Sequence, residues 1–207
     1  DRAKTEFVSL ASHQLRTPLS AIKWIIEVMT ESTPLTKPQK SYLRDIYVSN
    51  ERLINLVRDL LNVSKMEAGG INVRLMPGTD LHEIIDTAVD LLKHRADAKK
   101  VKIRVICEGE PEAEIDPVLL SEAFRNILDN AITFAPPKSV VDVNGKTDDG
   151  TCTIAVHNEG PAIPESDRER IFTKFYRGVG AQRLKPEGSG LGLFIAKSAI
   201  EAMGGKI

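Results

Sequence analysis

The chain has 207 residues, of which 42% are hydrophobic and 28% are charged, as is usual for a globular protein of one or two domains. Its formal net charge of −1 leaves no broad basic surface and argues against binding to nucleic acid or to an anionic membrane. No apolar run approaches the length of about 18 residues that a transmembrane helix needs, and no signal peptide opens the chain.

The first predicted helix carries an apolar seam with a histidine beside it. Apolar residues recur at steps of three, four and seven, the spacing of a helix packed in a bundle: Val8, Leu15, Leu19, Ile22, Ile26 and Met29. On this register Ser12 lies on the seam, His13 faces outward, and Thr17 shares the face of His13. Pro18 lacks an N–H group and is expected to interrupt and kink this helix. Taken alone, His13 is typical of an ordinary surface histidine.

A second amphipathic helix is predicted from about residue 38 to residue 68. Its seam consists of Leu43, Ile46, Asn50, Leu53, Val57 and Leu60. A short connection through Pro34 and Pro38 makes the two helices an antiparallel hairpin, which Gly69 and Gly70 end. One hairpin cannot cover both apolar stripes, so we expect a homodimer whose two hairpins form a four-helix bundle.

After the glycines the pattern changes to a mixture of strands and helices. Strands are predicted over residues 71–75, 101–107, 140–147 and 151–157, and helices over residues 81–98, 117–134 and 192–202. Asp80 is the expected N-cap of the first of these helices, and Asp148-Asp149-Gly150 is a hairpin turn. This mixture predicts an α+β fold in which helices cover one face of a sheet, as an α/β sandwich. The predicted domains are residues 1–70 and 71–207.

The two cysteines, Cys107 and Cys152, each lie in a predicted strand and have no partner motif. Free buried thiols in a reducing cytosol are expected, although the sequence also leaves a disulfide open.

Two asparagines in the helix over residues 117–134 are unusual for a helix interior. Asn126 and Asn130 share one face among apolar neighbours, and asparagine is a mediocre helix former. An amide oxygen that binds Mg²⁺ would explain them, and exposed or capping amides would do so equally well.

Two glycine segments and an aromatic segment follow. Residues 156–164 end a strand at Asn158 and turn at Gly160, where a polar side chain can enter a pocket and backbone can approach a ligand. Residues 187–193 alternate glycines directly before a helix, an arrangement that leaves backbone amides free to bind phosphate. Residues 171–177, between them, also suit a hydrophobic plug with flanking cations. Residues 178–190 are predicted to form a mobile lid.

Together these segments resemble the sensor histidine kinases of two-component signalling. Residues 9–19 are similar to the phosphoacceptor box, and residues 126–131 to the Asn box. The other similar segments are 156–164 (first glycine box), 171–177 (Phe box) and 188–193 (second glycine box). The resemblance implies a dimerisation and phosphotransfer hairpin followed by an ATP-binding domain of the gyrase-type sandwich fold. It also implies transfer of the γ-phosphoryl of Mg-ATP to His13 and then to an aspartate of a response regulator.

The resemblance implies a role for each matching residue. His13 is the nucleophile, attacking through a neutral Nε2, with Gln14 and Thr17 as its catalytic neighbours. Asn130 binds Mg²⁺, and Asn126 supports the phosphate side. The other ATP-binding residues implied are Asn158, which contacts the adenine amino group, and Gly160, Ala162, Ile163, Lys174, Arg177, Gly188, Gly190, Leu191 and Gly192.

The sequence departs from the family pattern at a few of these positions. Gln14 stands where Glu or Asp is usual, so the imidazole gains no charge from its neighbour and a slower kinase step is expected. Asn158 replaces an aspartate, which predicts weaker nucleotide binding. Ala162 replaces a common glycine, and Thr133 a common basic residue. Thr17 is similar to the family residue that orients water for dephosphorylation of the regulator.

Two alternatives to an active kinase stay open. A degenerate signalling dimer is favoured by Gln14, Asn158 and Ala162. A nucleotide hydrolase is disfavoured, because Asn126 stands where related ATPases carry a glutamate. The family pattern continues into further strands after residue 207. A sensor or membrane segment is expected before residue 1. The protein is expected in the cytoplasm, with membrane attachment only through segments outside this chain.

Overall fold

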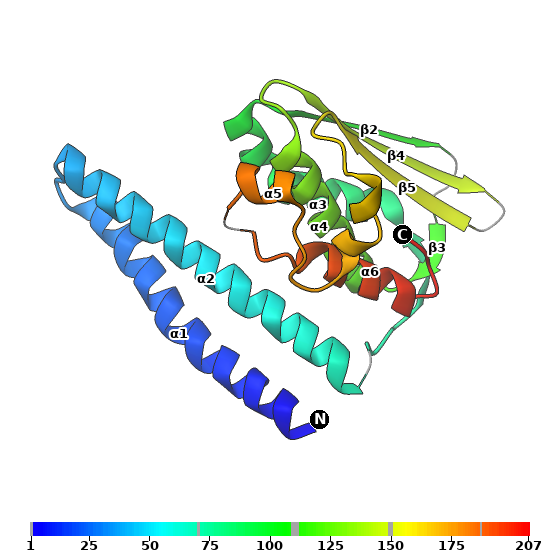
Figure 1. Ribbon diagram of the computed structural model, residues 1–207, viewed down its shortest axis with the longest axis horizontal. Helices are drawn as coiled ribbons and strands as arrows, with labels where there is room; N and C mark the ends of the chain where they lie inside the picture. The colour runs from blue at the N-terminus through cyan, green and yellow to red at the C-terminus, as the bar shows by residue number, and fades with distance from the viewer. Residues whose placement is uncertain (1, 70, 109–111, 149–150, 187) are drawn as a thin grey trace. The chain divides into compact units, whose positions relative to one another are not determined.

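The computed structural model describes residues 2–69, 71–108, 112–148, 151–186 and 188–207, and Figure 1 shows their fold. The chain divides into two compact units, Asp1–Gly70 and Ile71–Ile207. None of the helices in the described part is both long and apolar enough to cross a membrane.

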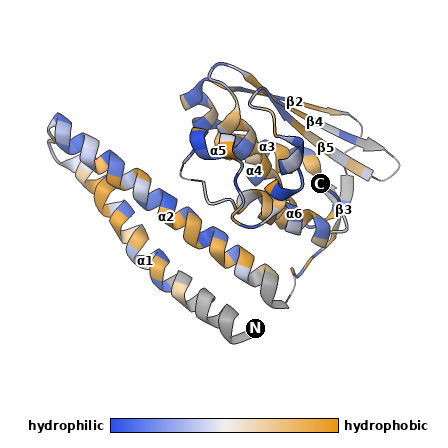
Figure 2. Cartoon of the chain, in the orientation of Figure 1, coloured by the Kyte–Doolittle hydropathy of each residue, from blue (hydrophilic) through white to orange (hydrophobic). Residues whose placement is uncertain are grey.

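The first unit is a hairpin of two long helices, α1 (Arg2–Ser32) and α2 (Lys37–Gly69), that lie side by side (Figure 1). Ile26 of α1 and Val57 and Leu61 of α2 are buried. Apolar residues recur along the length of both helices (Figure 2). Some of them are buried, and others remain exposed.

Helix α1 continues through Pro18, so the predicted interruption at this residue is wrong. A proline inside a helix costs about 3 kcal/mol, since it removes one backbone hydrogen bond and crowds the carbonyl four residues earlier. Packing against α2 along the apolar seam holds the helix together across this position.

The second unit is built around a mixed sheet of three strands in the order β2-β4-β5. These strands are β2 (Lys102–Glu108), β4 (Val140–Asp148) and β5 (Thr151–Asn158). Strand β4 pairs in parallel with β2 and in antiparallel fashion with β5. Helices α3 (Leu81–Lys99) and α4 (Pro117–Phe134) pack against the sheet, and α6 (Gly192–Ala202) packs against α4. The predicted α+β sandwich is therefore confirmed.

The core of this unit lies between the helices and the sheet. Its fully buried large side chains are Ile85, Phe124, Leu128, Val141, Val143, Leu191 and Ile195. Asp80 caps α3 as predicted, accepting a hydrogen bond from the His82 N–H at 2.8 Å. Neither Cys107 nor Cys152 forms a disulfide, and both are half-buried, in β2 and β5.

A second, small sheet differs from the prediction. Strand β1 (Met76–Asp80) pairs with β3 (Glu112–Ile115) in antiparallel fashion, whereas the predicted strand over residues 71–75 has no regular structure. The pairing partner decides where the strand forms, and β3 is too short to be recognised from its own residues. Short helices also lie in the Gly- and Pro-rich region: two 3₁₀ turns (Glu165–Asp167 and Arg170–Phe172) and α5 (Val179–Leu184).

Candidate functional site

Helix α4 carries the two asparagines singled out by the sequence. Its start is fixed by Asp116, whose Oδ1 accepts hydrogen bonds from the Val118 and Leu119 N–H groups at 3.0 and 3.1 Å. The apolar face of α4 is buried, which leaves Asn126 and Asn130 half-buried beside it. A Cβ added to Gly192 would lie 3.7 Å from Asn126 Oδ1, so the start of α6 lies directly against Asn126.

The first glycine segment is pressed against the other end of α4. Asn158 is the last residue of β5, and its Nδ2 donates to the Glu159 carbonyl at 3.3 Å. A Cβ added to Gly160 would lie 2.8 Å from both the Phe134 carbonyl oxygen and Asn158 Nδ2. Only glycine fits this approach, which brings Asn158 next to the end of α4. Ala162 and Ile163 follow in an exposed loop.

The aromatic segment and the second glycine segment lie in contact. The Phe175 N–H donates to the Gly190 carbonyl at 3.0 Å, and Leu191 is buried directly after it. Lys174 Nζ lies 4.8 Å from the centre of the Phe194 ring, a cation–π contact to α6. The alternative of a hydrophobic plug does not describe Phe175, whose side chain is 63% exposed.

Arg177 binds the backbone of the predicted lid. Its guanidinium donates to the carbonyls of Pro186 at 2.7 Å and Ala181 at 3.0 Å, and also to that of Lys185. A Cβ added to Gly188 would lie 3.1 Å from Arg177 Cζ. The resemblance implies that Arg177 is an ATP-binding residue, and in this structure its guanidinium organises residues 181–186. No sequence motif signals these bonds, because all of their acceptors are main-chain oxygens.

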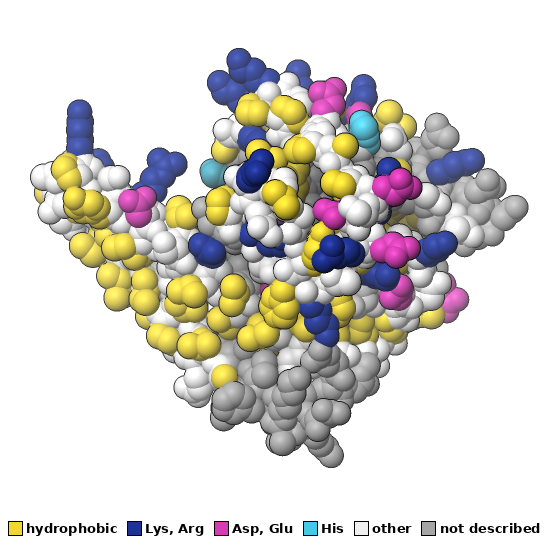
Figure 3. All heavy atoms as spheres, in the orientation of Figure 1, with side chains coloured by type: hydrophobic (Ala, Val, Ile, Leu, Met, Phe, Trp, Pro, Cys, Tyr) yellow, Lys and Arg dark blue, Asp and Glu magenta, His cyan; other side chains and the backbone are white. Residues whose placement is uncertain are grey.

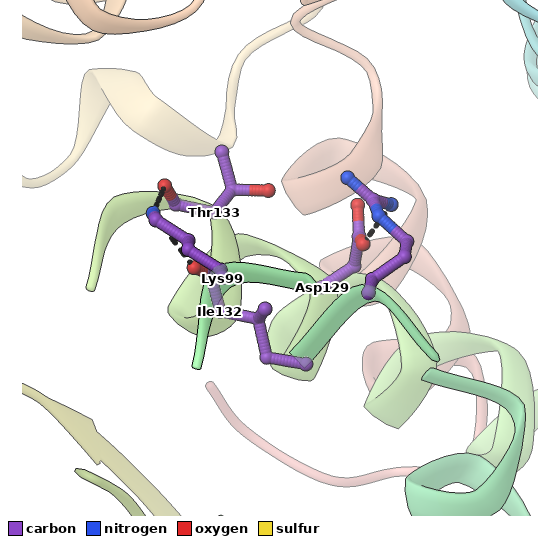
Figure 4. Close-up of polar contacts among 5 residues, drawn as sticks. Lys99, Asp129, Ile132 and Thr133 are labelled. Carbon is purple, nitrogen blue, oxygen red and sulfur yellow. Dashed lines mark hydrogen bonds and ion pairs between the residues drawn. The ribbon is translucent and has the colours of Figure 1, made fainter. Parts of the chain in front are cut away.

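A group of cations that sequence reasoning missed lies at the end of α4. Lys99 of α3 donates to the carbonyls of Ile132, at 3.1 Å, and Thr133 (Figure 4), and Arg95 pairs with Asp129. Burial, and then the nearby positive charges of Lys185 and Arg95, lower the pKa of Lys99. Lys99 thus binds two of the last carbonyls of α4, at a helix end whose dipole attracts positive charge.

The residues of this unit fit Mg-ATP. A Cβ on Gly160 or Gly190 would clash with the backbone of Phe134 or Phe175, so both glycine segments lie close to their neighbours, and the amide oxygen of the half-buried Asn126 lies beside Gly192. Within the described residues no group of three or more His, Cys, Asp or Glu is placed to hold a metal ion. Any Mg²⁺ here would therefore depend on amide oxygens, water and phosphate, a ligand set that suits this ion.

Residues 9–19, the segment of the predicted histidine site, lie in α1. Gln14 and Thr17 are exposed on this helix. The side chains of Val8, Ser12 and His13 lie outside the described residues, as do Gly70, the turn residues Asp149 and Gly150, and Glu187.

Two protein families match this chain. Residues 3–69 match the family described as "His Kinase A (phospho-acceptor) domain". Residues 115–207 match the family described as "Histidine kinase-, DNA gyrase B-, and HSP90-like ATPase". Each match lies within one of the two units.

Relatives from bacteria align over almost the whole chain. The "Non-motile and phage-resistance protein" of Caulobacter vibrioides is 32% identical over 207 residues, covering 97% of this chain and 24% of its own length. The "Signal transduction histidine-protein kinase/phosphatase MprB" of Mycobacterium sp. (strain KMS) is 31% identical, covering 99% of this chain and 39% of its own length. The chain thus spans less than half the length of either relative.

Solved structures share the fold. Full-length ShkA in complex with AMPPNP superimposes with a TM-score of 0.75 and 28% identity, covering 96% of this chain and 41% of ShkA. The histidine kinase ThkA in complex with the response regulator protein TrrA superimposes with a TM-score of 0.64 over 97% of this chain and 55% of ThkA. At 22% identity the second likeness concerns the fold alone. Both family matches and these relatives agree with the geometry of the site, and the chain belongs to the sensor histidine kinase family.

Proposed function

We propose that this chain is the kinase core of a sensor protein, transferring the γ-phosphoryl of ATP to His13 and then to an aspartate of a response regulator. The observation that carries the proposal is the assembly of the second unit. The Asn126 and Asn130 face, the Asn158 turn and the Gly190 segment all meet around α4. A hairpin that matches the phosphoacceptor family precedes this assembly.

The nucleotide is proposed to lie along α4. At the Phe134 end, the amide oxygen of Asn158 would accept a hydrogen bond from the adenine amino group, and Gly160, Ala162 and Ile163 would line the approach. At the Asn126 end, backbone N–H groups of residues 188–192 and the start of α6 would bind the phosphates. Lys174 lies in the segment held against Gly190 and would add positive charge.

The amide oxygen of Asn130 would hold Mg²⁺, and Asn126 would support the phosphate side. Bound Mg²⁺ neutralises charge on the phosphate oxygens. Asn126 is an amide and cannot take a proton from water, so this chain lacks a general base at that position. Transfer to a side chain is therefore favoured over hydrolysis.

His13 is proposed as the nucleophile. Its neutral Nε2 would form a bond to the γ-phosphorus while the bond from that phosphorus to the bridging oxygen breaks, so that ADP leaves. Gln14 can orient the imidazole but supplies no charge to the imidazolium that forms, and a slow kinase step follows.

A homodimer is proposed from the exposed stripe of the hairpin. Hydrophobic side chains gather along the hairpin (Figure 3), and on α2 they recur at heptad-like steps: Tyr42, Ile46, Leu53 and Leu60. An exposed apolar stripe of this length marks an interaction surface. Leu53, half of whose side chain is exposed, tests it: Leu53→Glu should give a monomer by light scattering, and a monomeric wild type would contradict the proposal.

A regulator phosphatase activity is proposed for Thr17. Thr17 is an exposed residue of α1 whose hydroxyl would orient water toward a phosphoaspartate, and the relative MprB is named a kinase/phosphatase. Thr17→Ala should keep autophosphorylation and lose dephosphorylation of the regulator, whereas unchanged phosphatase activity would disprove this role.

The kinase proposal is tested with γ-labelled Mg-ATP. Label that is acid-labile and base-stable in the wild type, and absent from His13→Gln, would establish transfer to His13. A chain that is not labelled but still forms the homodimer would instead be a degenerate signalling module. Rapid release of labelled phosphate would indicate a hydrolase. Because ATP and a receiver domain are cytoplasmic substrates, we place the activity in the cytoplasm, where the free thiols of Cys107 and Cys152 stay reduced.

A further inference from the structure

A layer of polar side chains crosses the middle of the hairpin. Asn50 of α2 is 4% exposed, and its Nδ2 donates to the Leu19 carbonyl of α1 at 2.8 Å. Next to it, Lys23 Nζ lies 3.0 Å from Glu51 Oε1 and 5.7 Å from the centre of the Tyr47 ring. The two helices are therefore tied together by directional contacts at this level.

Apolar contacts lie on both sides of this layer. Ile26 is buried on the side of the hairpin loop, and Val57 and Leu61 are buried on the side of the phosphoacceptor segment. An apolar core tolerates small sliding of one helix along the other, whereas one buried asparagine in a helical seam fixes the register of its partner. Asn50 is the fully buried member of the layer.

The presence of a buried amide at position 50 is not explained by a gain in the stability of the folded state. Its Oδ1 is buried and has no hydrogen-bond partner among the described residues. A buried acceptor without a donor destabilises the folded state, and an apolar side chain of similar shape would remove this cost. Asn50 therefore retains a polar group at a position where leucine would suit the core.

The carbonyl that accepts the Asn50 hydrogen bond lies directly after the proline of α1. Leu19 directly follows Pro18, and Pro18 has no N–H group to donate to the Gln14 carbonyl. The backbone of α1 is therefore least supported between residues 14 and 18, the turn that carries Thr17 and follows His13. Asn50 holds the first carbonyl beyond the proline.

We infer that Asn50 is a positioning residue for the phosphoacceptor turn. By binding the Leu19 carbonyl it holds α1 in register with α2 directly after Pro18, and so fixes where His13 and Thr17 stand for the reactions at this helix. The inference rests on the proposed function. It adds a residue on the second helix that touches neither nucleotide nor the phosphorylated side chain.

The test compares substitutions in the full chain. Asn50→Leu removes the bond and fills the space, Asn50→Ala removes the bond without adding volume, and Val57→Ala is the control at a buried apolar position of the same helix. We expect both Asn50 variants to lower the kcat of autophosphorylation about tenfold, since small displacements of reacting groups are costly. The KM for ATP should stay within about twofold, because the proposed nucleotide site lies in the other unit. Asn50→Leu should melt at or above the wild-type temperature, and Val57→Ala should melt lower with unchanged kcat.

Hydrogen exchange supplies a readout that does not require activity. In both Asn50 variants the amides of residues 15–17 and 19–23 should exchange at least about fivefold faster, while those of α3 stay unchanged. Unchanged exchange, or faster exchange with unchanged kcat in both variants, would overturn the inference. A wild type that takes no label at His13 would refute the proposed function, and the exchange rates would still decide whether Asn50 holds α1.

Discussion

The backbones of Phe175 and Gly190 are locked together. The Phe175 N–H donates to the Gly190 carbonyl at 3.0 Å, and both residues have left-handed backbone conformations, with φ of 62° and 69°. A Cβ on Gly190 would lie 2.8 Å from the carbonyl carbon of Phe175. The aromatic segment and the second glycine segment are therefore joined through their backbones, and the proposed phosphate site depends on their contact.

Substitution of Gly190 should break this contact. Gly190→Ala meets both a positive φ and a backbone clash, and we expect a loss of about 1–3 kcal/mol in the free energy of unfolding and weaker binding of an ATP analogue. Gly180→Ala is the control, because a Cβ there has nothing within 4 Å and Gly180 lies in α5. Thermal melts and calorimetric titration measure both quantities. Equal behaviour of the two variants would refute the role of the contact.

Arg177 should be required for an ordered lid. Arg177→Lys keeps the charge but cannot make the forked bonds to the Ala181 and Pro186 carbonyls, so chymotrypsin should cleave after Leu184 several times faster. Nucleotide affinity should fall as well. Arg183→Ala, which removes an exposed charge from the same segment, should change neither property. Resistance of Arg177→Lys to cleavage would show that the lid holds its shape by other means.

Asn158→Asp should tighten nucleotide binding. A carboxylate at the end of β5 would accept a charge-assisted hydrogen bond from the adenine amino group, which favours the complex by about 1 kcal/mol, or roughly fivefold in Kd. The control is Asn144→Asp, which adds the same charge at an exposed position of β4. Calorimetry with a non-hydrolysable analogue compares the two. This contact would be ruled out if Asn144→Asp also tightened binding, or if Asn158→Asp left the Kd unchanged.

Asp116 should make the stability of the second unit depend on acid pH. Burial raises the pKa of this carboxyl, but hydrogen bonds from the N–H groups of Arg74, Leu119 and Val118 outweigh burial and hold the pKa below its ordinary value. A lowered pKa stabilises the fold when the group is ionised, so the contribution is complete above about pH 5 and is lost as pH falls through the folded-state pKa.

Asp116→Asn tests this dependence. It keeps an oxygen for the helix cap but places an NH₂ group opposite the Arg74 N–H, which now lies 2.8 Å from Oδ2. We expect a loss of about 1–2 kcal/mol at pH 7 by urea unfolding, and convergence with the wild type as pH falls below about 4. If the difference in the free energy of unfolding between Asp116→Asn and the wild type did not change with pH, the charge of Asp116 would play no part in stability. Asp90→Asn, at an exposed position of α3, is the matched control.

Long elements with strong end signals could be predicted from the sequence. Helix α4 has the predicted bounds because Pro117 starts it and its apolar period is unbroken to Phe134. The hairpin strands β4 and β5 followed from their alternation around a turn. The segments that meet around α4 could be recognised in the sequence because their close backbone contacts require glycine at fixed positions, as at Gly190.

Contacts made by main-chain oxygens could not be predicted. Arg177 and Lys99 both bind carbonyl groups, which every residue has, so no residue type reveals the partner. Strand β3 consists of four residues and exists because β1 pairs with it. The Asn50 bond joins residues far apart in the chain, and only the packed hairpin brings its amide to Leu19.

The parallel pairing of β2 with β4 has a consequence for the order of folding. Lys102 lies opposite Val140, and the chain between these strands includes α4, so the sheet cannot close until that crossover has docked. The hairpin needs only the neighbouring helices α1 and α2, which form on a timescale of about a microsecond and leave the ribosome before the second unit does. In a newly made chain the phosphoacceptor helix therefore folds before the nucleotide site forms. Such a chain is inactive until the sheet closes.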